Sequence, residues 1–301
     1  MNILITGANG FLGKYICTIL GNNHKVYTLG RKLSDIYCDL RTDIPVLPNV
    51  YFDLVIHAAG KAHDNSLSDE IIQEIKDVNI RGTENLIKGF DSLSHYPKYF
   101  VFISSVSVYG LDEGQDVNEE MPLNAKDAYG NSKIFAEKFL ASWCLHHRIT
   151  FTSLRLPLVV GKMPPGNLGN MIKAINNNYY FNINKGKAKR SMVYADDVAK
   201  IIESASKIGG IYNLTDGYHP SFNELSSEIA LQLGKRKVIN LPLWMAKFLA
   251  KVGDFMGATF PINSIKLNKL SKDLTFDDTK ARNILDWKSQ NVLTVIKNVV
   301  P

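Results

Sequence analysis

The stretch Thr6-Gly7-Ala8-Asn9-Gly10-Phe11-Leu12-Gly13 decides the fold, and it directly follows the apolar run Ile3-Leu4-Ile5. An apolar run followed by glycines at every third position predicts a strand, a tight turn and the start of a helix. Gly7 permits the tight turn, Gly10 lets the backbone approach a pyrophosphate, and Gly13 lets the helix pack closely on the strand. The free N–H groups of a helix N-terminus attract an anion. The stretch therefore predicts a dinucleotide-binding turn, with Asn9, Phe11 and Leu12 beside the ligand.

The rest of the first half alternates short β-rich runs with longer helical ones, which is typical of βαβ units around a parallel sheet. Strands are predicted at Asn2–Thr6, Lys25–Leu29, Asp53–His57, Tyr99–Ser104 and Thr150–Leu156. Helices are predicted between them at Phe11–Gly21, about Ser68 to Leu93, and Tyr129–His147. We therefore expect an α/β fold, with a Rossmann-type doubly wound parallel sheet over residues 1–161 as the dinucleotide-binding domain.

The alternation loosens after Gly161 into a turn-rich stretch. Regular structure then resumes with a helix at Asp196–Ala205, which Asp196 or Asp197 should cap, a strand at Ile211–Leu214, and a helix opened by the capping box Ser221-Phe-Asn-Glu224. We expect residues 162–301 to form mainly a smaller C-terminal substrate-binding lobe, and the segment 190–217 to return to the first domain.

Composition and charge exclude several classes of protein. The chain has 301 residues, of which 45% are hydrophobic and 21% charged, so it should be an ordinary globule rather than disordered. Met1 leads straight into the apolar run with no basic region, and the apolar stretch Leu241–Phe260 is broken by charges. We expect neither a secretory signal nor insertion into a membrane. Three widely spaced cysteines, Cys17, Cys38 and Cys144, predict reduced thiols in the cytoplasm and no metal site.

Two further groups of residues can be explained without a role in catalysis. The net charge is only +6, and the basic cluster Lys185, Lys187 and Lys189 lacks interleaved aromatic residues, so we expect a solvated loop and no nucleic-acid partner. An apolar stripe at helical spacing favours core packing or a dimer contact; it consists of Trp244, Phe248, Val252 and Phe255.

Residues for proton transfer stand at the start of the third long helix. Tyr129 and Lys133 are four positions apart, so they share one helical face. The ordinary pKa of tyrosine is about 10, and a nearby ammonium lowers it. Tyr129 could then exchange a proton with a carbonyl or alcohol oxygen while hydride moves at the attached carbon. Ser104 and Ser105 end a buried strand at the edge where parallel sheets bind ligands.

The end of the second strand bears on the choice of cofactor. It reads Gly30-Arg31-Lys32, without the carboxylate that would bond a ribose 2′-hydroxyl. Arg31 could clamp a 2′-phosphate and Lys32 could add a charge, which favours NADP(H) while NAD(H) stays open. The alternative is that both are surface cations.

Together, these motifs resemble the extended short-chain dehydrogenase/reductase superfamily, also called the NAD-dependent epimerase/dehydratase family, and its branch that modifies nucleotide sugars. The resemblance rests on the Gly-x-x-Gly-x-x-Gly turn, the strand end Ser104-Ser-Val-Ser-Val-Tyr-Gly110, and Tyr129-x-x-x-Lys133. It implies catalytic roles for Ser105, Tyr129 and Lys133. It also implies cofactor contacts from Asp39, Leu40, Ala58, Ala59, Gly60, Asn79, Ser104, Leu156 and Pro157, besides the glycine turn, Tyr129 and Lys133. Its implied substrate contacts are Ser105, Ser107, Asn167 and Arg190, with Arg190 on the diphosphate, and it implies a homodimer.

Three functions stay open within this resemblance. Dehydratases of the family carry Asp-Glu after the catalytic Ser/Thr, and Val106-Ser107 stand here, so dehydration is not expected. Arg31 and Lys32 favour NADPH-dependent reduction of a UDP-4-keto-6-deoxy-hexosamine, a precursor of surface polysaccharide. The alternatives are an NAD-dependent nucleotide-sugar 4-epimerase and a non-catalytic cofactor-sensing module; the presence of both Tyr129 and Lys133 disfavours the latter. His57, at the end of an apolar strand, should be a hydrogen-bonded core residue rather than a base.

Overall fold

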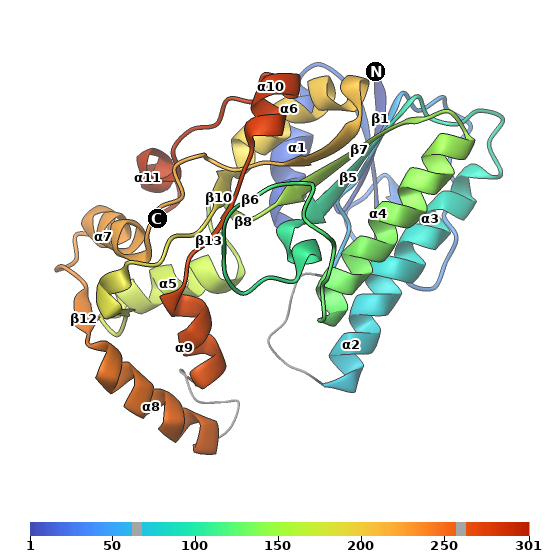
Figure 1. The fold of residues 1–301 in the computed structure, drawn as a ribbon. Coiled ribbons are helices and arrows are strands. Elements are labelled where there is room, and N and C mark those ends of the chain that lie inside the picture. The colour runs from blue at the N-terminus through green and yellow to red at the C-terminus, as the bar shows by residue number, and fades with distance from the viewer. Residues whose placement is uncertain (62–67, 257–262, 301) are drawn as a thin grey trace.

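The computed structural model describes residues 1–61, 68–256 and 263–300, and at its centre is a seven-stranded parallel sheet (Figure 1). In spatial order its strands are β11 (Gly210–Asn213), β7 (Thr150–Leu156), β5 (Tyr99–Ser105), β4 (Leu54–His57), β1 (Asn2–Thr6), β2 (Lys25–Gly30) and β3 (Ile36–Tyr37). The chain starts at β1, builds outward to β3, and then crosses to β4 on the other side of β1. Such a reversal creates a ligand crevice at the carboxyl ends of the strands. The predicted Rossmann-type parallel sheet is confirmed.

Helices cover both faces of this sheet because successive strand residues point to opposite sides and are apolar on both. In β1, Ile3 and Ile5 belong to one buried cluster and Leu4 to the other. The first face is covered by α1 (Phe11–Gly21) and α6 (Ala195–Ile208), and the second by α3 (Gly82–Phe90) and α4 (Ala128–His146). Each fully buried Ile or Leu contributes about 1.5–3 kcal/mol to the stability of this arrangement.

The helix predicted from about Ser68 to Leu93 forms as consecutive pieces. Ser68 caps α2 (Asp69–Lys76) by accepting the N–H of Ile71. A five-residue π-helical turn, η1 (Asp77–Arg81), then joins α2 to α3. Single π-helical turns are rare and often lie at functional sites; this one carries Asn79.

Short parallel strand pairs organise the C-terminal part and join it to the segment that follows β5. β8 (Leu158–Val160) pairs with β10 (Met192–Tyr194), β9 (Phe181–Ile183) with β12 (Ile239–Leu241), and β6 (Gly114–Val117) with β13 (Leu274–Phe276). The helices of this part are α5 (Gly166–Asn176), α7 (Phe222–Gln232), α8 (Leu243–Met256), α9 (Ser264–Ser271), α10 (Thr279–Leu285) and α11 (Val292–Val295). Short 3-10 turns are η2 (Val106–Tyr109), η3 (Asn184–Gly186) and η4 (Ile296–Asn298). Residues of α5, α7 and α11 share a third buried cluster.

Two local predictions for this part are wrong and one is confirmed. The helix α5 begins at Gly166, inside the segment 163–169 that is expected to be turn-rich, because Leu168, Ile172 and Ile175 bury one face of it in the third cluster. Asp197 does not cap α6: it lies in the first turn, where its carboxylate accepts the backbone N–H and the side-chain amide of Gln290 at 2.8 and 2.9 Å. The capping box at Ser221 is confirmed.

The apolar stripe on α8 is not part of the core, contrary to one of the two expectations for it. Trp244, Phe248 and Phe255 are 71%, 66% and 95% exposed. The helix instead turns the small residues Ala246 and Ala250 inward, toward α9. Among the described residues, none of the helices combines the length and apolar character needed to cross a bilayer.

Candidate active site

The glycine turn between β1 and α1 presses its backbone against the segment after β4. Gly7 has a positive φ of 75°, and a Cβ there would lie 2.6 Å from backbone atoms of Ala58 and Ala59. A Cβ on Gly13 would lie 2.1 Å from the carbonyl oxygen of Gly7. Gly10 begins α1 without any side-chain cap, so the backbone alone forms the start of this helix. Such a side-chain-free helix start fits a pyrophosphate.

Asn79 holds the neighbouring turn at residues 58–61. Its Oδ1 accepts the backbone N–H of Lys61 at 2.7 Å, and its Nδ2 donates to Ser132 Oγ at 2.9 Å and to the Lys61 carbonyl at 3.2 Å. A Cβ on Gly60 would lie 3.3 Å from both Asn79 Oδ1 and Lys133 Nζ. The π-helical turn η1 thus positions a backbone turn directly beside Lys133.

The end of β2 presents exposed Arg31 and Lys32, and Asn9 ties it to the glycine turn by donating to the Lys32 carbonyl. Asp39 is engaged by Arg41, whose Nε and Nη2 donate to its two oxygens at 2.9 and 2.6 Å. This pairing with Arg41 holds the pKa of Asp39 below its usual value, and the charge of Arg31 acts in the same direction. The adjacent carbonyl of Leu40 accepts from Asn85 Nδ2 at 2.9 Å.

Ser105, Tyr129 and Lys133 meet where β5 ends and α4 begins. Asp127 caps α4 by accepting the N–H of Gly130 at 2.9 Å. A hydrogen bond joins the side chains of Tyr129 and Ser105. Lys133 is only 5% exposed, and its Nζ donates to the carbonyl of Ile103 in β5 at 2.9 Å. The structure therefore brings the three residues together.

The electrostatics of this group differ from the expectation that Lys133 lowers the pKa of Tyr129. Burial raises the pKa of Tyr129 above its ordinary value of 10.0, and the hydrogen bond to Ser105 only opposes that increase. Burial also lowers the pKa of Lys133 to about 8, against the charge of Glu137, which raises it. The expectation is wrong for this structure because desolvation dominates and the Lys133 ammonium bonds the Ile103 carbonyl. Tyr129 is consequently a neutral phenol at pH 7, ready to donate its proton.

A buried polar network behind Lys133 was missed in the sequence. Glu137, one turn after Lys133, accepts from Arg155 Nε at 3.0 Å and Nη2 at 2.7 Å, and both side chains are 3% exposed. Arg155 Nη1 donates to the hydroxyl of Tyr109 at 3.0 Å, and Tyr109 donates to Asn213 Oδ1 at 2.8 Å. The available signal was an arginine inside an apolar strand, which needs a buried acidic partner.

The predicted substrate residues lie in separate places. Ser107 is in η2, where its Oγ accepts from Ser105 Oγ at 3.1 Å. Arg190 lies beside β13, donates to the Lys189 carbonyl at 3.0 Å, and stacks 5.5 Å from the ring centre of Phe222. Asn167 is exposed in the first turn of α5, so its placement in a turn-rich loop is wrong.

Ser104 supports the presence of a ligand in this crevice. Of the buried side-chain nitrogen and oxygen atoms in the described part of the chain, its Oγ alone has no hydrogen-bond partner. Leaving a buried hydroxyl unpaired costs about 1–3 kcal/mol. At the carboxyl end of β5, where parallel sheets bind ligands, such an atom fits a polar group of a bound dinucleotide. Leu156, at the end of β7, is buried and pairs in register with Ser105, and Pro157 follows at intermediate exposure.

His57 is the core residue that its position predicts. Its ring nitrogens lie 2.7 Å from Thr6 Oγ1 and 2.9 Å from Thr83 Oγ1. Burial, with the nearby charge of Lys133, lowers the pKa of His57 to about 3. A histidine held between two hydroxyls in this way serves the structure rather than proton transfer.

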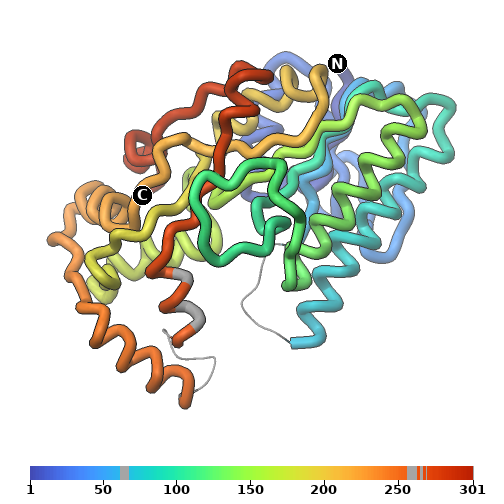
Figure 2. The backbone as a smooth tube through the Cα atoms, in the orientation of Figure 1, coloured from blue at the N-terminus to red at the C-terminus, as the bar shows by residue number. Residues whose placement is uncertain are grey.

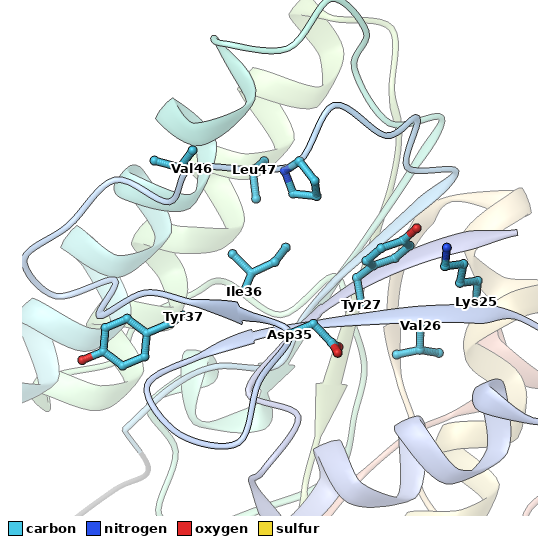
Figure 3. A pocket seen from close by; sticks show the side chains of 9 residues that line it. Lys25, Val26, Tyr27, Asp35, Ile36, Tyr37, Val46 and Leu47 are labelled. Carbon is cyan, nitrogen blue, oxygen red and sulfur yellow. The ribbon is translucent and has the colours of Figure 1, made fainter.

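An open hollow elsewhere on the molecule is not part of this site. Figure 3 shows that it lies beside the edge strand β3, between Tyr27, Tyr37 and Val46. Its lining includes none of the glycine turn, Ser105, Tyr129 or Lys133. Among the described residues, no group of three or more His, Cys, Asp or Glu side chains is arranged to hold a metal ion.

Comparison with known proteins identifies the family. A model of the NAD dependent epimerase/dehydratase family matches residues 3–214, more than two thirds of the chain. The chain belongs to this family. The match confirms the family that the sequence motifs resemble, and with it that the chain is an enzyme.

Individual relatives extend over nearly the whole chain. The chain is 25% identical over 297 residues to N-acetyl-alpha-D-glucosaminyl-diphospho-ditrans,octacis-undecaprenol 4-epimerase of Escherichia coli O157:H7, covering 93% of this chain and 88% of the relative. It is 29% identical over 315 residues to a decarboxylating sterol-4-alpha-carboxylate 3-dehydrogenase of Dictyostelium discoideum, covering 93% and 94%. The solved structure of UDP-glucose 4-epimerase from Thermotoga maritima, with UDP-glucose, aligns with a TM-score of 0.76 at 19% identity over 100% of this chain and 97% of that one, which shows the shared fold.

Proposed function

We propose that this enzyme is a 4-epimerase of sugars carried on a diphosphate, and that it uses a nicotinamide dinucleotide. The observation that carries the proposal is the hydrogen-bonded pair Tyr129–Ser105, near buried Lys133, which itself lies beside the turn at residues 58–60 that packs on the glycine turn. The E. coli relative is named for epimerisation of a sugar diphosphate at C4, and the T. maritima structure is of a UDP-glucose 4-epimerase. The activities in these two names favour epimerisation over the reduction that Arg31 and Lys32 favour.

Different residues would bind the cofactor and the substrate. The backbone of Gly7, Gly10 and Gly13 would hold the pyrophosphate, while Arg31 and Lys32 would face the adenosine ribose. The bound nicotinamide supplies reversible hydride acceptance. Ser104 Oγ and Lys133 Nζ would each donate to polar groups of the dinucleotide or substrate near the end of β5.

Tyr129 would carry the proton of the reaction. Its phenol first releases its proton to solvent. As the phenolate, its Oη takes the proton from the sugar C4 hydroxyl while that carbon is oxidised, and returns it to the same oxygen after hydride comes back on the opposite face. Ser105 Oγ orients this oxygen through a hydrogen bond. The ammonium of Lys133 stabilises the transient phenolate, since an adjacent positive charge favours the ionised form. No net oxidation of the sugar results.

Arg190 favours a diphosphate-bearing substrate over the sterol named for the D. discoideum relative. An arginine keeps its charge and matches phosphate oxygens bidentately. The proposed substrate is therefore a sugar linked to a nucleoside diphosphate or to a polyprenyl diphosphate, and the enzyme is proposed to act as a homodimer.

A second candidate function is NADPH-dependent reduction of a UDP-4-keto-6-deoxy-hexosamine. It is favoured by the exposed pair Arg31–Lys32 at the end of β2, where the nearest following carboxylate, Asp35, is engaged by the N–H and hydroxyl of Thr28 at 2.8 Å each. An NADP 2′-phosphate would meet two cations there and no free acid.

One experiment separates the two. The purified protein is assayed with UDP-hexoses and polyprenyl-diphosphate hexosamines for C4 inversion, and with UDP-4-keto sugars for NADPH oxidation. Inversion without net change in the dinucleotide supports the epimerase, and stoichiometric NADPH oxidation supports the reductase. Tyr129→Phe should abolish either activity and leave dinucleotide binding intact, whereas Tyr51→Phe, far from the site, should change neither. Full activity in Tyr129→Phe, or no reaction with any sugar diphosphate, would refute the proposal.

A further inference from the structure

Helix α8 presents an aromatic face to solvent at the edge of the molecule. Figures 1 and 2 show it (orange) projecting from the C-terminal part, at the end remote from the central sheet. Trp244, Phe248 and Phe255 are 71%, 66% and 95% exposed. At 3.6 residues per turn they project within about 40° of one another, so they form one stripe along the helix.

The opposite side of α8 anchors it to the protein. Ala246 and Ala250 are fully buried and share a cluster with Leu267 of α9. Asp254, the single acidic residue of α8, accepts the backbone N–H of Ser264 at 2.9 Å, at the start of α9. These contacts fix the rotation of α8 about its own axis, and the aromatic stripe therefore faces away from the protein.

Positive charge accompanies the stripe. Lys247 and Lys251 are exposed on its flank, about 60° and 20° around the helix from Trp244. The segment Lys235-Arg236-Lys237 precedes β12, which leads directly into α8. Residues 235–256 therefore contain five cations against one carboxylate, Asp254.

We propose that α8 and the basic segment before it dock the enzyme on an anionic phospholipid surface, with α8 lying in the plane of the interface. A helix with aromatic residues on one face and lysines beside them is suited to this position. Trp and Phe side chains enter the headgroup boundary, while Lys and Arg bind anionic lipids. The five cations favour an anionic lipid over a second copy of this chain as the partner, because a copy that carries the same five cations would repel them. This proposal does not depend on the proposed function, since it concerns a surface outside the active site.

Vesicle flotation of the intact chain tests the docking. Phosphatidylcholine vesicles that contain phosphatidylglycerol should carry the protein, and pure phosphatidylcholine vesicles should carry much less. The triple variant Trp244→Ser, Phe248→Ser and Phe255→Ser should bind about tenfold more weakly or worse, as should Lys247→Glu with Lys251→Glu. The matched control is Val46→Ser with Leu145→Ser, which removes residues 89% and 81% exposed elsewhere and should bind like the wild type.

Two further measurements test whether the α8 variants stay folded and whether Trp244 contacts lipid. Circular dichroism and the thermal transition should be unchanged in the α8 variants, because the replaced side chains are exposed. Brominated lipid should quench tryptophan emission in the wild type and fail to do so in Trp244→Phe. Of the other two tryptophans, Trp287 is 4% exposed, and half-buried Trp143 packs on Phe90 and Tyr96, away from α8. The proposal is overturned if the wild type does not float with anionic vesicles at low salt, or if the triple variant floats equally well. It is also overturned if the α8 variants split a dimer while the wild type ignores lipid.

Discussion

Replacing Glu137 by Gln removes one charge from the buried pair behind Lys133 and keeps the size of the side chain. Arg155 would then retain its positive charge at 3% exposure without the carboxylate that lies 2.7 Å from its Nη2. Removing one partner of a buried ion pair costs about 3–5 kcal/mol, because the other charge stays desolvated and uncompensated. We expect Glu137→Gln to lower the free energy of unfolding by that amount. Adding Arg155→Met should restore most of it, since no buried charge then remains.

Denaturant unfolding at neutral pH measures the difference, with the m-value checked for constancy. The matched control is Glu203→Gln, which removes the carboxylate from the more exposed contacts with Lys207 and His24 and should cost at most about 1 kcal/mol. If Glu137→Gln costs no more than this control, or if Arg155→Met makes the loss larger, the reasoning is refuted. A second readout is the pH profile: Glu137 raises the pKa of Lys133, so its loss should move the alkaline decline of activity to lower pH.

Three other perturbations test the site. Gly13→Ala should abolish dinucleotide binding and destabilise the fold, because its Cβ would lie 2.1 Å from the Gly7 carbonyl oxygen. The control Gly21→Ala should be neutral, because no atom lies within 4 Å of the added Cβ. Binding titrations and thermal melts compare the two variants. The pKa of His57 is lowered to about 3, so between pH 6.5 and 3 the unfolded chain binds a proton that the folded chain does not, and stability should fall as pH falls through that window, less so in His57→Gln. The pKa of Lys133 is lowered to about 8, so the free energy of unfolding should rise as pH rises from 8 to 10.5. Turnover that needs the charge of Lys133 should decline above about pH 8. A flat activity profile across that range would contradict its role.

The sequence predicts the nucleotide-binding half well because its signals are local. The glycine turn and the apolar strands leave few alternatives, and Tyr129 and Lys133 need only helical spacing to share a face. The pKa of Tyr129 could not be predicted in the same way. It depends on how deeply the side chain is buried and on where Lys133 Nζ points, and both follow from packing of α4 against β5.

The C-terminal part is less predictable because tertiary contacts decide its structure. The composition before Asn176 favours turns, yet burial of Leu168 and Ile175 forms α5 there. The stripe on α8 has the spacing of a core helix, and only the packing of Ala246 and Ala250 shows which side faces inward. Helical periodicity finds an apolar face but does not say whether protein covers it.

The return of α6 and β11 to the central sheet has a consequence for synthesis on the ribosome. When β7 has just been made, the apolar residues of β1 and α1 that α6 later covers, such as Ile5 and Ile16, still lack α6. At about 5–20 residues per second, α6 follows roughly 3–10 s later. During that interval the nascent chain exposes the part of this sheet face that α6 later covers, which makes it a natural client for ribosome-associated chaperones. For the same reason, cutting the gene after residue 161 would yield an aggregating fragment instead of a soluble nucleotide-binding domain.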